Sequence, residues 1–176
     1  LLSLYASTRW PSVELVVAFD LPAFHDAIEA RAQIGKQSLM TRLLAMEGRA
    51  SRLMCWLMCH GRRMFRFIAP LLAPGVPADV ARAATLHTWP SYSGTYAAIV
   101  QAAKPRAWIT GTQARVVVIQ GDHDEICPPA LVRDVLAGLP VDVHALAGDH
   151  QLPLRDPAGC VLAIEDALRR RGGDTV

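Results

Sequence analysis

The 176 residues suffice for one domain with a sizeable core, and their 52% apolar fraction excludes a disordered chain. The mean hydropathy of +0.22 likewise indicates a compact globular protein. Four cysteines show neither the spacing of a metal site nor the density of a disulfide scaffold, which fits a reducing compartment; they are Cys55, Cys59, Cys127 and Cys160. We therefore expect a cytoplasmic location.

The chain begins with a helical pattern followed by a strand. The apolar stretch from Leu1 to Ala6 is typical of the body of a helix, and residues 13–19 have the β-branched and apolar composition of a strand. Asp20 follows the strand directly, where a helix cap or a solvated carboxylate is its simplest role. Residues 1–20 are thus expected to form one helix and one strand.

Residues 21–111 are expected to form a mostly helical segment. Helical patterns cover 22–34, 36–47, 49–60, 62–72, 77–87 and 91–103, and glycines or the Pro74-Gly75-Val76-Pro77 turn separate several of them. We find no internal repeat.

The middle of this segment is strongly basic. Eight basic residues lie between Arg31 and Arg66 against the single acidic residue Glu47. Such a face can attract anionic substrates, a membrane surface or nucleic acid, but no aromatic-interleaved motif indicates nucleic acid. The apolar run 53–59 is too short to span a bilayer, although it can lie on one beside the arginines. A buried helix with a solvated basic neighbour is the simpler interpretation.

Residues 112–176 predict alternating strands and helices. A β-branched run, 115–119, ends at Gly121 and an acidic loop, and a second strand over 141–146 ends at a loop that contains His150. A helix is predicted between Pro128 and Gly138, and another from the capping residue Asp156 to Arg171. Val161, Leu162, Ile164 and Leu168 are its expected apolar stripe. Continuous apolar strands indicate a parallel sheet covered on both faces, with ligands bound beyond the carboxyl ends of the strands.

This region resembles the carboxyl-terminal half of an α/β-hydrolase. Gly121, Asp124 and Pro128 match the family pattern Gly-x-x-Asp-x-x-x-Pro after the penultimate strand. His150, Pro153 and Pro157 match His-x-x-Pro-x-x-x-Pro after the last strand. The order Asp then His agrees with the family's order of triad members. The resemblance implies an α/β fold with a partial hydrolase core. Residues 1–20 would be the end of the first core half, 21–111 a helical cap and 112–176 the carboxyl-terminal core.

The resemblance assigns two catalytic roles to this chain. His150 is the expected general base and acid, and Asp124 is the carboxylate that orients the imidazole. Asp122 and Glu125 flank Asp124, and Asp20 stands where some family members carry the acid, so these alternatives stay open. His123 is interpreted as a solvated loop histidine, and the charge of Asp149 beside His150 favours a protonated imidazole.

A nucleophile of the expected kind is absent from the 176 residues. No Gly-x-Ser-x-Gly motif, or its Cys or Asp version, occurs, and Ser38, Ser51, Ser91 and Ser93 lie in other contexts. In the family a strand like 13–19 follows the helix after the nucleophile. We therefore expect the chain to be a fragment that begins just after its nucleophile, to have an unprotected sheet edge and to be inactive alone.

The resulting expectation is a hydrolase of a carboxylic ester, or a related acyl bond, in an apolar small molecule. Trp89, Tyr92 and Tyr96 resemble the last cap segment of some hydrolases, where aromatic residues line an apolar pocket, although ordinary cap core explains them equally well. We expect no metal, since His60 and His87 lack partner spacing, and no cofactor. Alternatives are a haloalkane or epoxide hydrolase with an Asp nucleophile, an acyltransferase, a non-catalytic binding protein and a peripheral membrane adaptor. The oligomeric state is left open.

Overall fold

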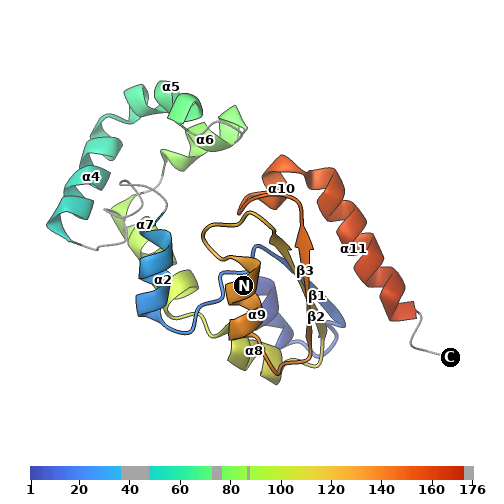
Figure 1. Ribbon diagram of the computed structural model, residues 1–176. Coiled ribbons are helices and arrows are strands. Elements are labelled where there is room, and N and C mark those ends of the chain that lie inside the picture. Colours follow the sequence, from blue (N-terminus) through green and yellow to red (C-terminus); the bar gives the residue numbers. More distant parts are fainter. Residues whose placement is uncertain (37–47, 73–76, 87, 173–176) are drawn as a thin grey trace. The chain divides into compact units, whose positions relative to one another are not determined.

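The computed structural model describes residues 1–36, 48–72, 77–86 and 88–172 (Figure 1). The chain divides into two compact units: unit 1 comprises Leu1–His25 and Ala103–Val176, and unit 2 comprises Asp26–Ala102. Unit 1 thus includes residues 21–25 and 103–111, which the sequence analysis groups with the helical segment. The helix predicted over 36–47 and the turn at 74–77 fall largely outside the described residues.

A three-stranded parallel sheet forms the centre of unit 1, as the sequence predicts. Its strands lie in the order β1 (Leu15–Phe19), β2 (Arg115–Gly121) and β3 (Val141–Leu146). The central strand β2 is buried at six of its seven positions, which accounts for its unbroken apolar run. The register aligns Phe19 with Ile119 and Ile119 with His144, so the three carboxyl ends lie at one edge of the sheet.

Helices cover both faces of this sheet. On one face, α1 (Leu2–Ser7), α8 (Pro105–Gly111) and α9 (Pro129–Val135) bury apolar side chains against the strands. On the other, α10 (Leu152–Arg155) and α11 (Pro157–Gly172) pack on Val117 and Ile119. Figure 1 shows α11 on one side of the strands and α8 and α9 on the other. The short helices α8 and α10 are not predicted by the sequence, because each is about one or two turns long.

Helix α11 begins as predicted but buries a different face. Asp156 Oδ1 accepts a hydrogen bond from the Gly159 N–H at 2.9 Å, and Pro157 is the first helical residue. The predicted apolar stripe is wrong: Val161, Leu162 and Leu168 are 54, 62 and 49% exposed. The residues that pack on the sheet are small ones at helical spacing, Cys160, Ala163 and Ala167. Small side chains let the helix approach the strands closely, and this contact sets which face is buried.

Unit 2 is helical in the residues that the structure describes. Its helices are α2 (Ala27–Ile34), α4 (Arg49–His60), α5 (Arg62–Leu72), α6 (Ala78–Ala84) and α7 (Trp89–Tyr96), followed by a π-helix, η1 (Ala97–Gln101). The bounds of α4 and α5 are those predicted. Helix α2 begins later than expected because Asp26 caps it, with Oδ1 accepting from the Ile28 and Glu29 N–H groups at 2.8 Å each.

The apolar run on α4 is only partly buried. Cys55 is 1% exposed, but Leu53, Trp56 and Leu57 are 57, 54 and 46% exposed, which corrects the interpretation of α4 as a buried helix. Among the described helices, none combines the length and apolar character needed to cross a membrane.

Candidate active site

The acid loop and the histidine loop meet at the carboxyl edge of the sheet. Asp124 follows β2 and His150 follows β3, and the His150 Nδ1 atom lies 2.8 Å from Asp124 Oδ2. The Asp124 side chain has no exposed surface, whereas the imidazole is 31% exposed. A buried carboxylate thus holds one nitrogen of a reachable imidazole, and because that carboxylate accepts the Nδ1 proton, Nε2 is left to exchange a proton with another group.

Asp124 is a fully used hydrogen-bond acceptor. Its Oδ1 accepts from the backbone N–H groups of Ile126 (2.8 Å) and Cys127 (2.9 Å), and its Oδ2 accepts from Gln120 Nε2 (2.5 Å) as well as from His150. Gln120 is completely buried and also donates to the Cys127 carbonyl at 2.9 Å. This network fixes the carboxylate in one orientation, which in turn fixes the imidazole.

Sequence reasoning missed Gln120. A signal is present, however: Gln120 is the only polar residue between Val116 and Gly121, and it stands at the end of the strand where functional groups gather. A buried amide in an otherwise apolar strand needs hydrogen-bond partners, and Asp124 and Cys127 accept from its Nε2 group, whereas its Oε1 atom is buried without a partner in the described residues.

The titration of the pair follows from these contacts. Burial by itself raises the pKa of Asp124, but the hydrogen bonds from His150, Cys127 and Ile126 and the charge of His150 outweigh it, so the pKa is lowered. Burial lowers the pKa of His150, but the bond to Asp124 and the charges of Asp124, Asp20 and Asp149 raise it above its ordinary value. Asp124 is therefore ionised at neutral pH, and it favours the imidazolium form of its partner.

Asp20 lies in the same site, buried, which corrects the expectation of a helix cap or solvated carboxylate. It has a positive φ of 47° and is 7% exposed. Its Oδ1 accepts from the Gly121 N–H at 3.1 Å and its Oδ2 from the Leu152 N–H at 3.2 Å. Burial raises its pKa, despite these bonds and the charge of His150. Asp20 thus connects the end of β1 to the end of β2 and to the histidine loop.

The two loops also approach each other closely through their backbones. A Cβ atom added to Gly121 would lie 2.5 Å from the Asp149 carbonyl oxygen and 2.7 Å from that of Gly148. Gly148 itself has a φ of +148°, in the region that glycine adopts readily. A glycine is therefore required at position 121, because a side chain there would collide with the backbone of the histidine loop.

The alternative residues around the dyad have other partners. Asp122 Oδ1 lies 2.6 Å from His123 Nδ1 and accepts from the Gly148 N–H at 2.9 Å, so Asp122 supports the histidine loop from outside. The His123 side chain is 82% exposed. Asp149 pairs with Arg155 at 3.1 Å. Of the candidate acids, Asp124 is the one hydrogen-bonded to His150.

Three solved structures are similar to this chain over 93 to 94% of its length. They are an E-2-(acetamidomethylene)succinate hydrolase (TM-score 0.59, 17% identity), an N-formylmaleamic acid deformylase from Pseudomonas putida S16 (0.60, 7%) and a hydrolase from Pseudomonas aeruginosa PA01 (0.57, 16%). These neighbours are hydrolases of the α/β-hydrolase kind. This chain has a partial α/β-hydrolase fold.

The chain spans about 60% of the length of these three structures, covering 61, 61 and 59% of them. No family model and no curated protein matches the sequence. At these identities the likeness establishes the α/β-hydrolase fold and leaves the chemistry to be argued from the residues.

Asp20, Asp124 and His150 offer ligand-type atoms within 4.8 Å of one another. Each carboxylate oxygen of Asp20 and Asp124 already accepts a hydrogen bond, and His150 Nδ1 is engaged with Asp124. Two carboxylates therefore surround one imidazole, and the described hydrogen bonds already engage all three side chains.

The aromatic candidates belong to unit 2. On α7, the Tyr92 and Tyr96 rings stack with centroids 6.2 Å apart, and Trp89 lies 6.1 Å from Tyr92. Tyr96 is 7% exposed, and the other two are half-buried. The three rings thus form one row of aromatic contacts along α7. Their role in substrate binding stays a prediction.

Of the four serines named in the sequence analysis, three form hydrogen bonds with nearby residues of unit 2, and the fourth lies outside the described residues. Ser51 Oγ accepts from the Gly48 N–H, Ser91 forms a capping box with Thr88, and Ser93 Oγ donates to the Trp89 carbonyl. Ser38 and His87 lie outside the described residues.

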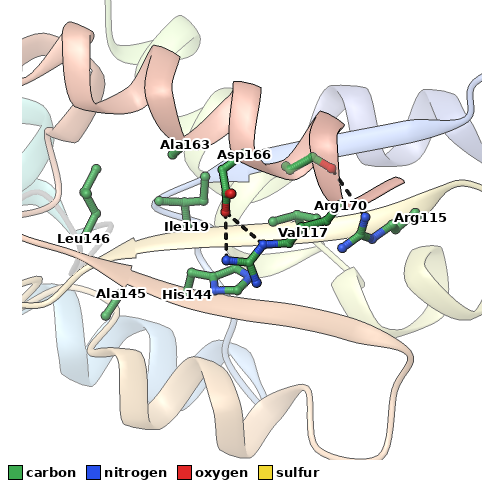
Figure 2. A pocket seen from close by; sticks show the side chains of 10 residues that line it. Arg115, Val117, Ile119, His144, Ala145, Leu146, Ala163, Asp166 and Arg170 are labelled. Atoms are coloured by element: carbon green, nitrogen blue, oxygen red, sulfur yellow. Dashed lines mark hydrogen bonds and ion pairs between the residues drawn. The ribbon is translucent and has the colours of Figure 1, made fainter. Parts of the chain in front are cut away.

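A small cavity lies between the sheet and α11, away from the dyad (Figure 2). Its volume is about 120 Å³, and its lining includes Val117, Ile119 and His144 from the strands and Ala163 and Ala167 from the helix. Figure 2 shows the ion pair between Asp166 and Arg170 of α11 among the residues that line it. The small side chains of α11 leave this space unfilled, and we interpret it as a packing gap in the core.

Proposed function

We propose that this chain supplies the acid and histidine of a Ser-His-Asp triad that hydrolyses a carboxylic ester or a related acyl bond. The observation that carries the proposal is the 2.8 Å contact between His150 Nδ1 and the buried, fully hydrogen-bonded Asp124. An imidazole held in this way accepts a proton at Nε2 and is stabilised once charged. The serine is contributed from outside the 176 residues, because they contain no nucleophile motif.

The proposed reaction assigns one role to each group. His150 Nε2 takes the proton of the serine hydroxyl as the oxygen attacks the acyl carbon, and then returns it to the leaving group. A water molecule, deprotonated by the same nitrogen, releases the acid from the acyl-enzyme. Asp124 keeps the imidazole oriented and stabilises its charged form throughout.

The acyl class extends to amides. The names of two structural neighbours, the acetamidomethylene succinate hydrolase and the formylmaleamic acid deformylase, indicate acyl groups on nitrogen. The same acid and histidine also serve an Asp nucleophile in the haloalkane and epoxide hydrolase alternative, and a non-catalytic protein would have no nucleophile.

The test uses the protein that carries this chain, assayed with p-nitrophenyl esters and the matching anilides. We expect turnover of the esters and covalent labelling of one serine by a fluorophosphonate probe. His150→Ala should reduce kcat by roughly 10³-fold or more. His123→Ala is the matched control, since that imidazole is exposed and bonded to Asp122, and it should leave turnover within a factor of two.

Two outcomes contradict the proposal. Equal turnover by wild type and His150→Ala would remove His150 from the chemistry. Labelling of no residue, together with alkyl-halide or epoxide hydrolysis, would assign an Asp nucleophile instead.

A further inference from the structure

A basic pocket on unit 2 has no role in the proposed reaction. Arg63, Arg66 and Phe67 of α5 and Arg82 of α6 line an open pocket of about 420 Å³. Helices α5 and α6 pack against each other, and Arg82 lines the same pocket as the arginines of α5. Arg63 and Phe67 are one helical turn apart, which puts them on the same face.

The three guanidinium groups are not neutralised within the described part of unit 2. None of the ion pairs in the described residues includes Arg63, Arg66 or Arg82. Between residues 48 and 86 the sequence has six arginines and one acidic residue, Asp79 on α6. Three like charges around one pocket repel each other, and an anion placed among them relieves that repulsion.

The side chains of the pocket define the chemistry of its ligand. Guanidinium groups are planar forks that bind carboxylates through paired hydrogen bonds. More than one carboxylate suits three such groups, and Phe67, which is 82% exposed, offers an apolar surface beside them. We propose that this pocket binds a small organic dicarboxylate with an apolar part. The binding is a property of unit 2 and is independent of the Asp124–His150 dyad.

The experiment measures binding of phenylsuccinate to the whole chain by isothermal titration calorimetry, with the neutral diamide of phenylsuccinate as comparison. We expect the dicarboxylate to bind with a Kd on the order of 0.1–1 mM and the diamide to bind at least tenfold more weakly. Raising the salt concentration should weaken binding of the dicarboxylate, because salt screens the attraction between its charges and the arginines.

Variants assign the binding to the pocket. Arg66→Gln and Arg82→Gln should each weaken phenylsuccinate binding at least fivefold. Arg66→Lys should lose part of the affinity, because an ammonium group cannot form the paired hydrogen bonds of a guanidinium group. Arg133→Gln, an exposed arginine on α9 of unit 1, is the matched control and should bind as wild type. His150→Ala should also bind as wild type. Circular dichroism establishes that each variant is folded.

Several outcomes overturn the proposal. Equal binding of the dicarboxylate and its diamide would assign the affinity to Phe67 alone. Unchanged binding by the two Gln variants would locate it elsewhere. Sedimentation of the chain with phosphatidylglycerol vesicles that 10 mM phenylsuccinate does not reverse would assign the arginines to lipid headgroups.

Discussion

Asp20 Oδ2 accepts a hydrogen bond from the backbone N–H of Leu152, a residue 132 positions away in the chain, at 3.2 Å. Its other oxygen accepts from the Gly121 N–H. Leu152 follows His150 by two residues, so Asp20 restrains the loop that presents the imidazole. Asp20 is therefore a positioning residue in the proposed site, whereas Asp124 contacts the imidazole directly.

Asp20→Asn is predicted to release the histidine loop. Asn tolerates the positive φ of position 20, but its amide nitrogen is a donor, so one of the two backbone N–H groups loses its acceptor. We expect the amide of Leu152 or Gly121 to exchange with solvent at least tenfold faster, as measured by hydrogen exchange with NMR. Asp142→Asn, an exposed carboxylate on β3, is the control. Unchanged exchange at both amides would contradict the positioning role.

The His150 imidazole is predicted to titrate above its ordinary pKa of about 6.5, because Asp124 stabilises the charged form. NMR of labelled histidine side chains measures this value in the whole chain. Asp124→Asn should lower the pKa of His150, and Asp20→Asn should lower it less, since Asp124 both bonds to the imidazole and attracts its charge, whereas Asp20 makes no direct bond to it. If Asp124→Asn left the pKa of His150 unchanged, the contact between Asp124 and His150 would not persist in solution.

The pH dependence of stability is predicted to carry the signature of both groups. The lowered pKa of Asp124 stabilises the fold fully above the unfolded value of about 3.9, and this contribution is lost as the pH falls through the folded value. The raised pKa of His150 stabilises the fold below about 6.5 and is lost as the pH rises through the folded value. Urea unfolding from pH 3 to 9 should show both declines, and Asp124→Asn should flatten both. Parallel curves for wild type and variant would contradict this linkage.

Gly121→Ala is predicted to destabilise unit 1 by about 2 kcal/mol or more, because the new methyl group would meet the Gly148 and Asp149 carbonyls below contact distance. Urea unfolding measures the loss. Gly111→Ala is the matched control, since its Cβ would make only an ordinary contact with Thr8 at 3.8 Å. Equal stability of the two variants would show that the histidine loop can move away at little cost.

Gln120→Met, a substitution of similar volume, is predicted to destabilise the fold by about 1–3 kcal/mol and to raise the pKa of Asp124. The variant removes the donor to Asp124 and leaves the Cys127 carbonyl without that bond. Urea unfolding and the NMR titration of Asp124 report the two effects. An unchanged pKa of Asp124 would mean that the remaining donors hold the carboxylate by themselves.

The elements that sequence reasoning predicted well are those with local signals. The unbroken apolar composition of β2, the Asp156-Pro157 start of α11 and the glycines that bound α4 each specify their structure within a few residues. The two motifs named Asp124 and His150, and the structure brings these side chains into contact; their catalytic role stays a prediction.

The failures concern relations between distant segments. The buried face of α11 depends on how closely the helix approaches the sheet, which its own periodicity does not determine, so Cys160 and Ala167 pack where larger residues were expected. Asp20 was expected to be a helix cap or a solvated carboxylate, with the role of triad acid as the alternative. Its partners are on β2 and beyond β3, and only the assembled sheet brings them near.

The parallel pairing of β1 with β2 joins segments with nearly a hundred residues between them, whereas about twenty separate β2 from β3. Closing the longer loop costs more chain entropy and takes longer, so the pairing of β2 with β3 should nucleate folding. The acid and histidine loops would then come together in the early structure, and β1 would dock afterwards. Asp20 therefore makes its bonds to both loops in the last stage of assembly, and substitutions there should accelerate unfolding while leaving the folding rate nearly unchanged.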